Sequence, residues 1–444
     1  ETNEIMLDIN TVSIVPKAPT AGYVPSSINE SGVEQINGKG TGDVIVDIID
    51  NTAIESDNSY QIIFTDNGSQ VEYSVLDQKD VSDSVVVRLG QYTKLSHKNL
   101  DTSFVSVTSL NGVAYSEDVD FNLLPDDGQI YALGSGSMTE GETIIVMYRY
   151  FPIRNSIKMA SEEGNPIFDG MTLTVQDNQL ELDNDQINWN ESSNTNWTWL
   201  VKPFNNLSTN FYPADYEIRW FNSAVSSNSR PGFEYVKTNF ELWETTRKNT
   251  EKQLEFMIVE SGASDSLWNP GERIIFLQDS TLSSASWEMT FYEPTAVLDT
   301  IPPKEGDIFT IYTNRSFTDD IFTFSTTASS GDTQVEKDNM DNIYVVPNPY
   351  VVSNKIEQLD LQNPQDRGPR RIYFANLPSN CTIKIYTISG DLVRTLKHES
   401  SIEDGIEYWD LTTSDNFPVA FGVYIFHVES ESGNEVVGRF ALIK

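Results

Sequence analysis

The residues that could carry nucleophilic or metal chemistry are few in this chain. It has one cysteine, Cys381, and three histidines, His97, His398 and His427, which lie far apart in the sequence. A zinc site needs clustered Cys and His ligands, and a Ser-His-Asp or Cys-His unit would have to use one of these histidines. No phosphate-binding, nucleophile-elbow or dinucleotide-binding motif stands in a suitable context. We therefore expect no enzyme activity and no resident organic cofactor, and we expect Cys381 to be a semi-buried small residue.

Pairs of carboxylates in predicted turns are the candidates for a metal site. Calcium prefers several carboxylate and carbonyl oxygens from one loop, and the spacing within Asp183/Asp185 and within Asp118/Asp120 suits it. Neither pair completes a calcium-loop motif, and with 66 acidic residues such pairs also arise on an ordinary solvated surface. A calcium site and a solvated acidic surface both stay open. A glycosidase would need two carboxylates facing each other across a cleft, and the sequence offers too many candidates to choose a pair.

Three tryptophans, Trp189, Trp197 and Trp199, lie in an asparagine-rich segment. Exposed on a strand, such rings stack on sugars, so one hypothesis is a glycan-binding surface. The alternative is that they close a sandwich core, with their indole N–H groups bonded to nearby backbone.

The first residues alternate apolar and polar side chains, with Ile5, Leu7 and Ile9 on one face of an extended strand. This strand could complete the protein's own first sandwich. It could instead add to a sheet edge of a neighbouring subunit, where main-chain bonds give affinity and alternate side chains give register. Such a head-to-tail contact does not close and would build a homopolymer.

Composition excludes several classes of partner. The 444 residues include 29 Lys and Arg against 66 Asp and Glu, a net charge of −37. Binding to nucleic acid phosphates needs clustered cations, and anionic lipid headgroups would repel this chain. No apolar run approaches the ~18 residues that span a bilayer. The chain begins at Glu1 without a Met, which is typical of a processed product or an excerpt.

Alternation with period two dominates the sequence, as in residues 43–49, 60–64, 143–150 and 216–220. These runs are rich in β-branched and aromatic residues and are separated by Asn-Gly and Asp-Gly turns. The pattern predicts an all-β protein of serial, Ig-like β-sandwiches. Residues 242–258 fit either a short helix or a strand followed by a polar turn. The predicted regions are an extended arm at 1–25, a sandwich region at 26–165 with an inserted β unit at about 100–152, a second sandwich region at 166–325, a linker at 326–342 and a C-terminal Ig-like domain at 343–444.

The C-terminal region carries an ordered set of cues. Two prolines in Pro347-Asn348-Pro349 fix an extended start, Ser389-Gly390 makes a tight turn, and Trp409 is a predicted core anchor. Ile383 and Ile385 share one face of a strand. The motifs of this region are Pro347-Asn348-Pro349, Ile385 to Gly390, Trp409-Asp410, Gly422-Val423-Tyr424 and the final Lys444.

This set resembles the C-terminal sorting domain of proteins exported by the type IX secretion system, and the related Ig-like domain of the flagellar hook-capping protein. Phe421 departs from the pattern, because the family usually has a small residue there. The rest of the chain resembles, more loosely, β-sandwich modules of large secreted bacterial surface proteins. The resemblance implies passage through the outer membrane of a diderm bacterium, with the secretion machinery as a partner. The sorting domain of this family is often removed after export; here the chain is either a precursor or a protein that keeps the domain.

Together these patterns predict an extracellular structural or adhesive protein of the cell surface, with self-association into a filament, sheath or surface layer. A secreted carbohydrate-binding accessory protein that uses the tryptophans is the first alternative. A secreted hydrolase is the second.

Overall fold

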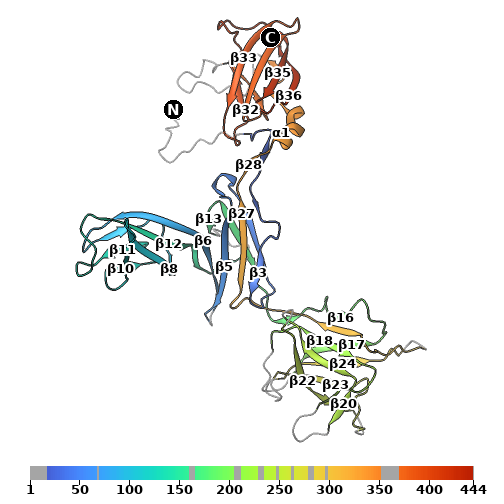
Figure 1. The fold of residues 1–444 in the computed structure, drawn as a ribbon. Helices are drawn as coiled ribbons and strands as arrows, with labels where there is room; N and C mark the ends of the chain where they lie inside the picture. The colour runs from blue at the N-terminus through green and yellow to red at the C-terminus, as the bar shows by residue number, and fades with distance from the viewer. Residues whose placement is uncertain are drawn as a thin grey trace, which may run out of the picture. The chain divides into compact units, whose positions relative to one another are not determined.

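The computed structural model describes residues 18–67, 70–159, 166–204, 212–228, 235–246, 250–261, 265–278, 285–295, 299–351 and 370–443. The chain divides into two compact units. Unit 1 comprises residues 1–27, 50–56 and 326–444, and unit 2 comprises 28–49 and 57–325. Antiparallel strands make up most of the regular structure, which confirms the predicted all-β class with serial sandwiches (Figure 1). Within the described ranges, no helix is both long and apolar enough to cross a membrane.

Two sheets form the sandwich at the C-terminal end of unit 1, drawn in orange and red in Figure 1. The five-stranded sheet has the order β30 (Tyr350–Val351), β36 (Glu435–Ile443), β35 (Gly422–Ser430), β32 (Asn380–Thr387) and β33 (Leu392–Glu399). The three-stranded sheet has the order β29 (Tyr344–Val346), β31 (Ile372–Ala375) and β34 (Glu407–Trp409). Among the described strand pairs of this sandwich, only β30–β36 is parallel. The hairpins predicted from the local cues are therefore present.

The core of this sandwich follows from the alternation of its strands. Ile383 and Ile385 are fully buried on the inner face of β32, as their spacing predicts. Trp409 is 1% exposed, and its indole N–H donates to the carbonyl of Thr412 at 2.9 Å. Gly390 has φ +92 in the β32–β33 turn, a backbone conformation that other residues rarely adopt.

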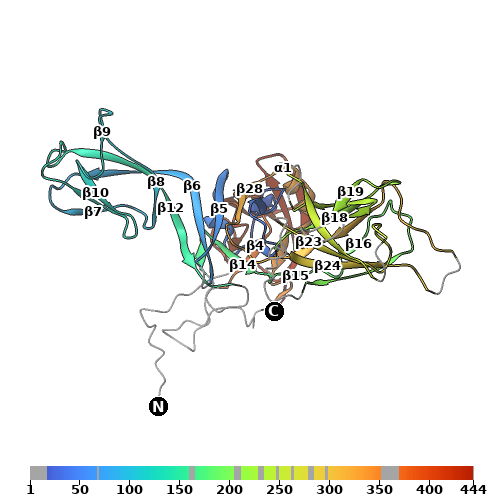
Figure 2. The same ribbon diagram turned by 90° about the horizontal axis from the view of Figure 1, so that it is seen from below.

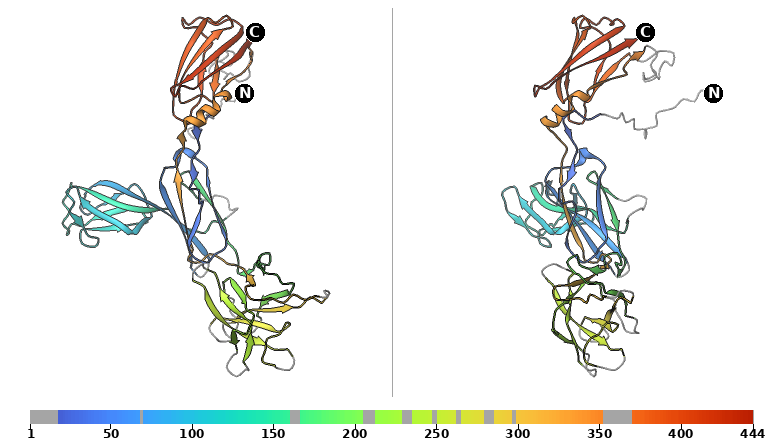
Figure 3. Two further views of the ribbon diagram at one scale, coloured as in Figure 1. Left: turned by 45° about the vertical axis from the view of Figure 1, so that its right-hand side comes forward. Right: turned by 90° about the vertical axis from the view of Figure 1, so that its right-hand side faces the viewer.

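Unit 1 also contains the short elements that lead into the sandwich. β1 (Tyr23–Val24) pairs with β28 (Ser330–Gly331), and η1 (Asn51–Ala53) is a single 3₁₀ turn. The helix α1 (Thr333–Asn339) is followed by η3 (Met340–Asn342) and lies beside the strands of the sandwich (Figure 3). Asp332 begins α1 by accepting hydrogen bonds from the N–H groups of Gln334 and Val335. The segment predicted as a linker, 326–342, thus holds strand and helix, because a seven-residue helix is too short to show a helical period in its sequence.

The first sheet of unit 2 is built from segments far apart in the sequence. Its order is β2 (Ser27–Ile28), β27 (Ile321–Thr327), β5 (Asn58–Asp66), β6 (Val71–Val86), β12 (Thr143–Ser156), β8 (Leu100–Ser109) and β9 (Ala114–Tyr115), with β3 (Glu34–Asn37) also on β27. A three-stranded sheet joins β13 (Ile167–Phe168), β14 (Met171–Gln176) and β4 (Asp43–Ile48).

The inserted β unit contains the end of β6 and the beginning of β12, the two longest of the described strands. They pair with each other, β12 also pairs with β8, and Figure 2 shows these strands beside the small sheet of this unit. That sheet has the order β10 (Phe121–Leu124), β11 (Gln129–Ala132) and β7 (Tyr92–Lys94). The core here includes Val85 and Val87, so the inserted unit begins well before the predicted residue 100.

The second large region of unit 2 has an eight-stranded sheet around an aromatic core. Its order is β16 (Asn188–Trp189), β25 (Ile308–Ile311), β18 (Tyr216–Trp220), β21 (Phe240–Glu244), β22 (Lys252–Val259), β23 (Arg273–Leu277), β24 (Ala285–Tyr292) and β17 (Thr198–Pro203). Two short pairs accompany it, β15 (Glu181–Leu182) with β26 (Thr313–Asn314) and β19 (Ser226–Asn228) with β20 (Val236–Thr238). Strands β21 and β22 cover residues 242–244 and 252–258 of the segment 242–258, so the strand interpretation holds for the part of that segment that they cover.

Strand pairing divides the chain differently from the predicted boundaries. Strand β14 lies beyond residue 166 but pairs with β4, and β27 at 321–327 pairs with β3 in the first region. The second region, from β15 to β26, is therefore inserted into the first. Alternation shows that a segment is a strand, but it carries no information on which distant strand is its neighbour.

Candidate functional site

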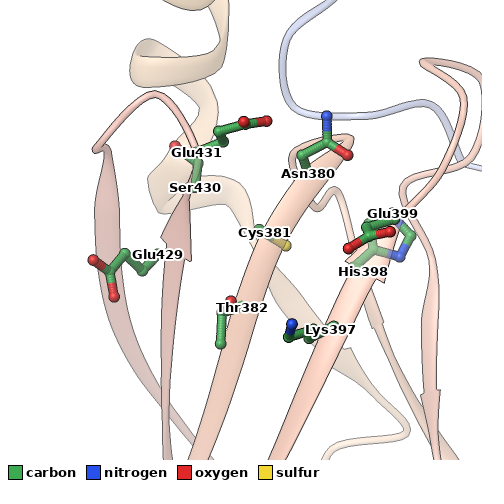
Figure 4. A pocket seen from close by; sticks show the side chains of 9 residues that line it. All are labelled: Asn380, Cys381, Thr382, Lys397, His398, Glu399, Glu429, Ser430 and Glu431. Carbon is green, nitrogen blue, oxygen red and sulfur yellow. The ribbon is translucent and has the colours of Figure 1, made fainter.

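The single cysteine and one histidine meet in a shallow pocket at one end of the C-terminal sandwich. The pocket has a volume of about 560 Å³ and is formed by the adjacent strands β33, β32 and β35. Figure 4 shows Cys381 on β32, between His398 on β33 and Ser430 on β35. Cys381 and His398 are directly opposite each other in the strand register. His398 lies in β33 and is 3% exposed.

The ring of His398 has polar partners on both nitrogens. Its Nδ1 lies 3.1 Å from a carboxylate oxygen of Glu407, and its Nε2 lies 2.9 Å from Ser400 Oγ and 3.0 Å from the carbonyl oxygen of Asp404. The order Ser400, His398, Glu407 repeats the connectivity of a hydrolase triad. The sequence does not reveal this cluster, because its members come into contact only when the loop after β33 folds back onto the end of that strand.

The hydroxyl of Ser400 has other partners that compete with the triad arrangement. It also donates toward the carbonyl oxygens of Asp404 and Ser401, the latter at 3.1 Å. A hydroxyl has one proton to donate, and a carbonyl oxygen can only accept. When Ser400 donates that proton to a carbonyl oxygen, it cannot also donate it to Nε2 of His398. The cluster is therefore arranged to fasten the 400–407 loop to β33, with the Glu407 carboxylate facing the ring from the other side.

Cys381 is poorly suited to act as a nucleophile at neutral pH. Burial raises the pKa of its thiol to about 12, and the negative charges of Glu407 and Glu336 add to the effect. The thiolate is the reactive form of cysteine. The sequence predicted a semi-buried small residue, and Cys381 is in fact buried, at 7% exposed.

The other two histidines take part in separate contacts. The Nδ1 of His97 lies 3.2 Å from the hydroxyl of Tyr148, which donates to Asp83, and the His97 ring stacks on Tyr150 with 4.0 Å between centroids. This group lies at a second pocket of about 430 Å³ in the inserted unit. His427 faces Glu435 across β35 and β36 at 3.1 Å.

Two of the four carboxylates proposed for calcium, Asp120 and Asp183, accept hydrogen bonds from loop residues. Asp120 accepts hydrogen bonds from the N–H of Ser116 and from both the N–H and the hydroxyl of Ser137, at 2.7–2.9 Å. These bonds hold the pKa of Asp120 below its ordinary value. Asp118, its predicted partner, has φ +65 and donates its N–H to Phe121.

Asp183 accepts from the N–H of Asp185 at 3.2 Å, which closes an Asx-type turn. Within the described ranges, no three His, Cys, Asp or Glu side chains gather as metal ligands would. The calcium site stays a prediction.

The three tryptophans meet at the core of the second region. Trp197 is 6% exposed, and its indole N–H donates to Thr300 Oγ1 at 3.1 Å. The indole N–H of Trp189 donates to the carbonyl of Trp197 at 3.1 Å, and the Trp199 ring packs edge-on against Phe309. Trp189 and Trp199 are partly buried against the same core. Glycan binding stays untested, but Trp197 offers no open ring face to a sugar.

The predicted assembly residues, Ile5, Leu7 and Ile9, lie outside the described residues.

Comparison with known proteins gives only distant likenesses. No family model and no curated protein matches the chain. Among solved structures, PorZ, a bacterial surface component of the type IX secretion system of Porphyromonas gingivalis, is 17% identical over 46% of this chain and 21% of PorZ, with a TM-score of 0.20. Dimeric latent PorU from the same organism is 10% identical over 73% of this chain and 42% of PorU, with a TM-score of 0.16. The BSP domain of a biofilm-associated protein is 9% identical, covers 89% and 67%, and has a TM-score of 0.14.

The chain thus spans about a fifth of PorZ and about two fifths of PorU. Likenesses at these TM-scores carry no conclusion about this chain.

Proposed function

We propose that this chain is a non-enzymatic extracellular protein of the surface of a diderm bacterium, and that its C-terminal sandwich is an export domain of the type IX kind. The observation that carries the proposal is that the cues of that resemblance fall at structural positions of one complete sandwich. The Pro347–Pro349 segment connects β29 to β30, and the Ile385–Gly390 segment runs into the β32–β33 turn.

Two further cues belong to the core and the closing strands of the same sandwich, and Lys444 lies outside the described residues. Trp409 is buried beside Tyr424 and Phe440. Gly422 begins β35, which pairs along its length with β36. A sorting domain must fold as a unit that a secretion machinery can recognise, and these positions support that role.

The chemistry-bearing side chains support a role without catalysis. The raised pKa of Cys381 favours the protonated thiol, and the Ser400 hydroxyl donates to carbonyl oxygens rather than to His398 as a base. The strong negative charge of the chain would keep such a surface protein soluble. Assembly through sheet edges or domain faces, rather than turnover in a cleft, is then the working hypothesis.

Export is tested with the full chain fused to an N-terminal secretory signal peptide. An epitope is inserted in the exposed turn at 110–113 and the protein is expressed in two matched hosts, one with an intact type IX system and one lacking it. We expect protease-accessible epitope on the surface of the first host and retention in the periplasm of the second. A chain ending at residue 342 should be retained in both. Equal display in the two hosts would refute the export role.

Self-association is tested on material taken from the cell surface. We expect negative-stain electron microscopy to show ordered filaments or sheets, and intact mass to include residues 343–444. Monodisperse particles lacking those residues would contradict the structural role and favour a released protein.

A further inference from the structure

The described chain begins with a segment that is bonded to the C-terminal sandwich. We call residues 18–24 the N-terminal strap. The N–H of Gly405 donates to the carbonyl of Ala18 at 2.7 Å. The N–H and the hydroxyl of Thr20 both donate to the carbonyl of Ile402, at 2.9 and 3.0 Å. These partners are 382 or more residues apart in the sequence, so the first described residues depend on the last domain.

The second half of the strap is bonded to the elements that lead into the sandwich. The N–H of Ala21 donates to Leu377 at 3.0 Å, and its carbonyl accepts from the side chain of Asn339 in α1 at 3.1 Å. The carbonyl of Gly22 accepts the N–H of Asp332 at 2.8 Å. Strand β1 then pairs with β28. The strap therefore lies between the sandwich and the segment that connects it to the rest of the chain.

Burial shows that this contact is close-packed. Ala21 is 1% exposed and Thr20 is 4% exposed. A Cβ atom placed on Gly405 would lie 2.6 Å from the carbonyl oxygen of Pro19 and 2.9 Å from the Cα of Thr20. Only a glycine leaves room for the strap backbone at this point.

The loop that receives the strap is itself held in place. His398 and Ser400 fasten the carbonyl of Asp404 to β33, and the N–H of Leu377 donates to the carbonyl of Gly405. This gives the buried histidine cluster a structural task, which is to fix the loop that presents Ile402 and Gly405 to the strap.

We propose that the N-terminal strap is a second attachment of the C-terminal sandwich to this protein. A cut in the connection before α1 severs the main chain, but the sandwich stays bound through residues 18–24. The consequence for surface display rests on the proposed function: an export domain fastened in this way is not released by one proteolytic cut.

The test uses the purified full chain with a specific protease site inserted between Ala328 and Ser329. After complete cleavage, the pieces 1–328 and 329–444 are analysed by size-exclusion chromatography with mass measurement. We expect one species of the original mass. In a matched chain that starts at Pro25, the strap bonds and two buried side chains are lost, so the dissociation constant should rise by at least ~100-fold and the small piece should separate.

Two single substitutions separate strap loss from misfolding. Gly405→Ala places a methyl group against the strap and should also release the small piece. Gly331→Ala is the control, since its Cβ would meet only Ile402 Cγ2, at an ordinary 3.5 Å. Protection of Cys381 from thiol reagents verifies that the sandwich stays folded in each variant.

Three results would overturn the proposal. Separation of the pieces after cleavage of the unaltered chain would show that the strap does not hold. Continued association after removal of the strap would show that other contacts hold the sandwich. A cleaved species of twice the mass would show that the strap is exchanged between two copies. All three are measured on purified protein, so they do not depend on export.

Discussion

The one cysteine of the chain makes the folding of the C-terminal sandwich directly measurable. Cys381 is buried, and its thiol pKa is raised to about 12. At pH 8 a thiol with that pKa is ionised to roughly one part in 10⁴, whereas an exposed thiol with a pKa of about 8.5 is about one quarter ionised. Since the thiolate is the reacting form, we expect labelling of native Cys381 to be on the order of 10³-fold slower than that of glutathione.

The assay is reaction with Ellman's reagent under pseudo-first-order conditions. The native chain, the chain in denaturing urea and glutathione are compared in the same buffer, with Cys381→Ser as the blank. Denaturation should bring the rate close to that of glutathione, because burial is the main cause of the protection. A native rate within tenfold of glutathione would refute the description of Cys381 as a buried, protonated thiol.

The same pKa shift predicts how stability depends on pH. The folded pKa lies above the unfolded value, so the contribution of the protonated thiol is complete below the ordinary thiol pKa of 9.0 and is lost as pH rises toward about 12. Within that window the free energy of unfolding should fall by up to ~1.4 kcal/mol per pH unit from this group alone. Cys381→Ala removes the group, so the difference between the two proteins isolates it. Parallel curves for the two proteins would contradict the assignment.

Three further substitutions test particular packing and charge contacts. Trp409→Ala removes the core anchor of the sandwich and should cost about 3–5 kcal/mol, measured in urea by exposure of Cys381; an unchanged midpoint would contradict its role. Buried Arg315 donates to both carboxylate oxygens of the partly buried Asp215, at 2.6 and 3.2 Å, so Arg315→Ala should destabilise unit 2 by about 3–5 kcal/mol in fluorescence-monitored unfolding, and Arg315→Lys should recover only part of this. The lowered pKa of Asp120 contributes stability that is present above pH 3.8 and is lost as pH falls below it, and Asp120→Asn should remove this contribution. Tm values that fall equally with acid in both proteins would count against this.

The C-terminal sandwich was predictable from the sequence because its contacts are mostly local. Its hairpins join neighbours in the chain, and alternation places Ile383 and Ile385 on one face. The turn at Gly390 carries its own conformational requirement, φ +92. Such features are encoded within about ten residues, so they can be identified without knowing the rest of the fold.

The candidate site was predictable only in part. A single cysteine and three histidines already limited the chemistry, and composition alone argued against a metal cluster of Cys and His. The environment of His398 was missed, because its partners lie on a loop that returns to the strand end through tertiary contacts. The sequence shows that the three tryptophans lie close together along the chain, but only packing decides whether an indole faces a core or the solvent.

The sequence by itself determined the all-β class, the strand positions and the C-terminal sandwich, because alternation and turn residues act over short distances. Tertiary structure alone decided which distant strands pair: β14 with β4, and β27 with β3. It also decided that Thr20 and Ala21 are buried against residues 377 and 402. Almost every residue offers the same backbone N–H and carbonyl groups, so the main-chain hydrogen bond from Thr20 to Ile402 could not be predicted from the sequence of either segment.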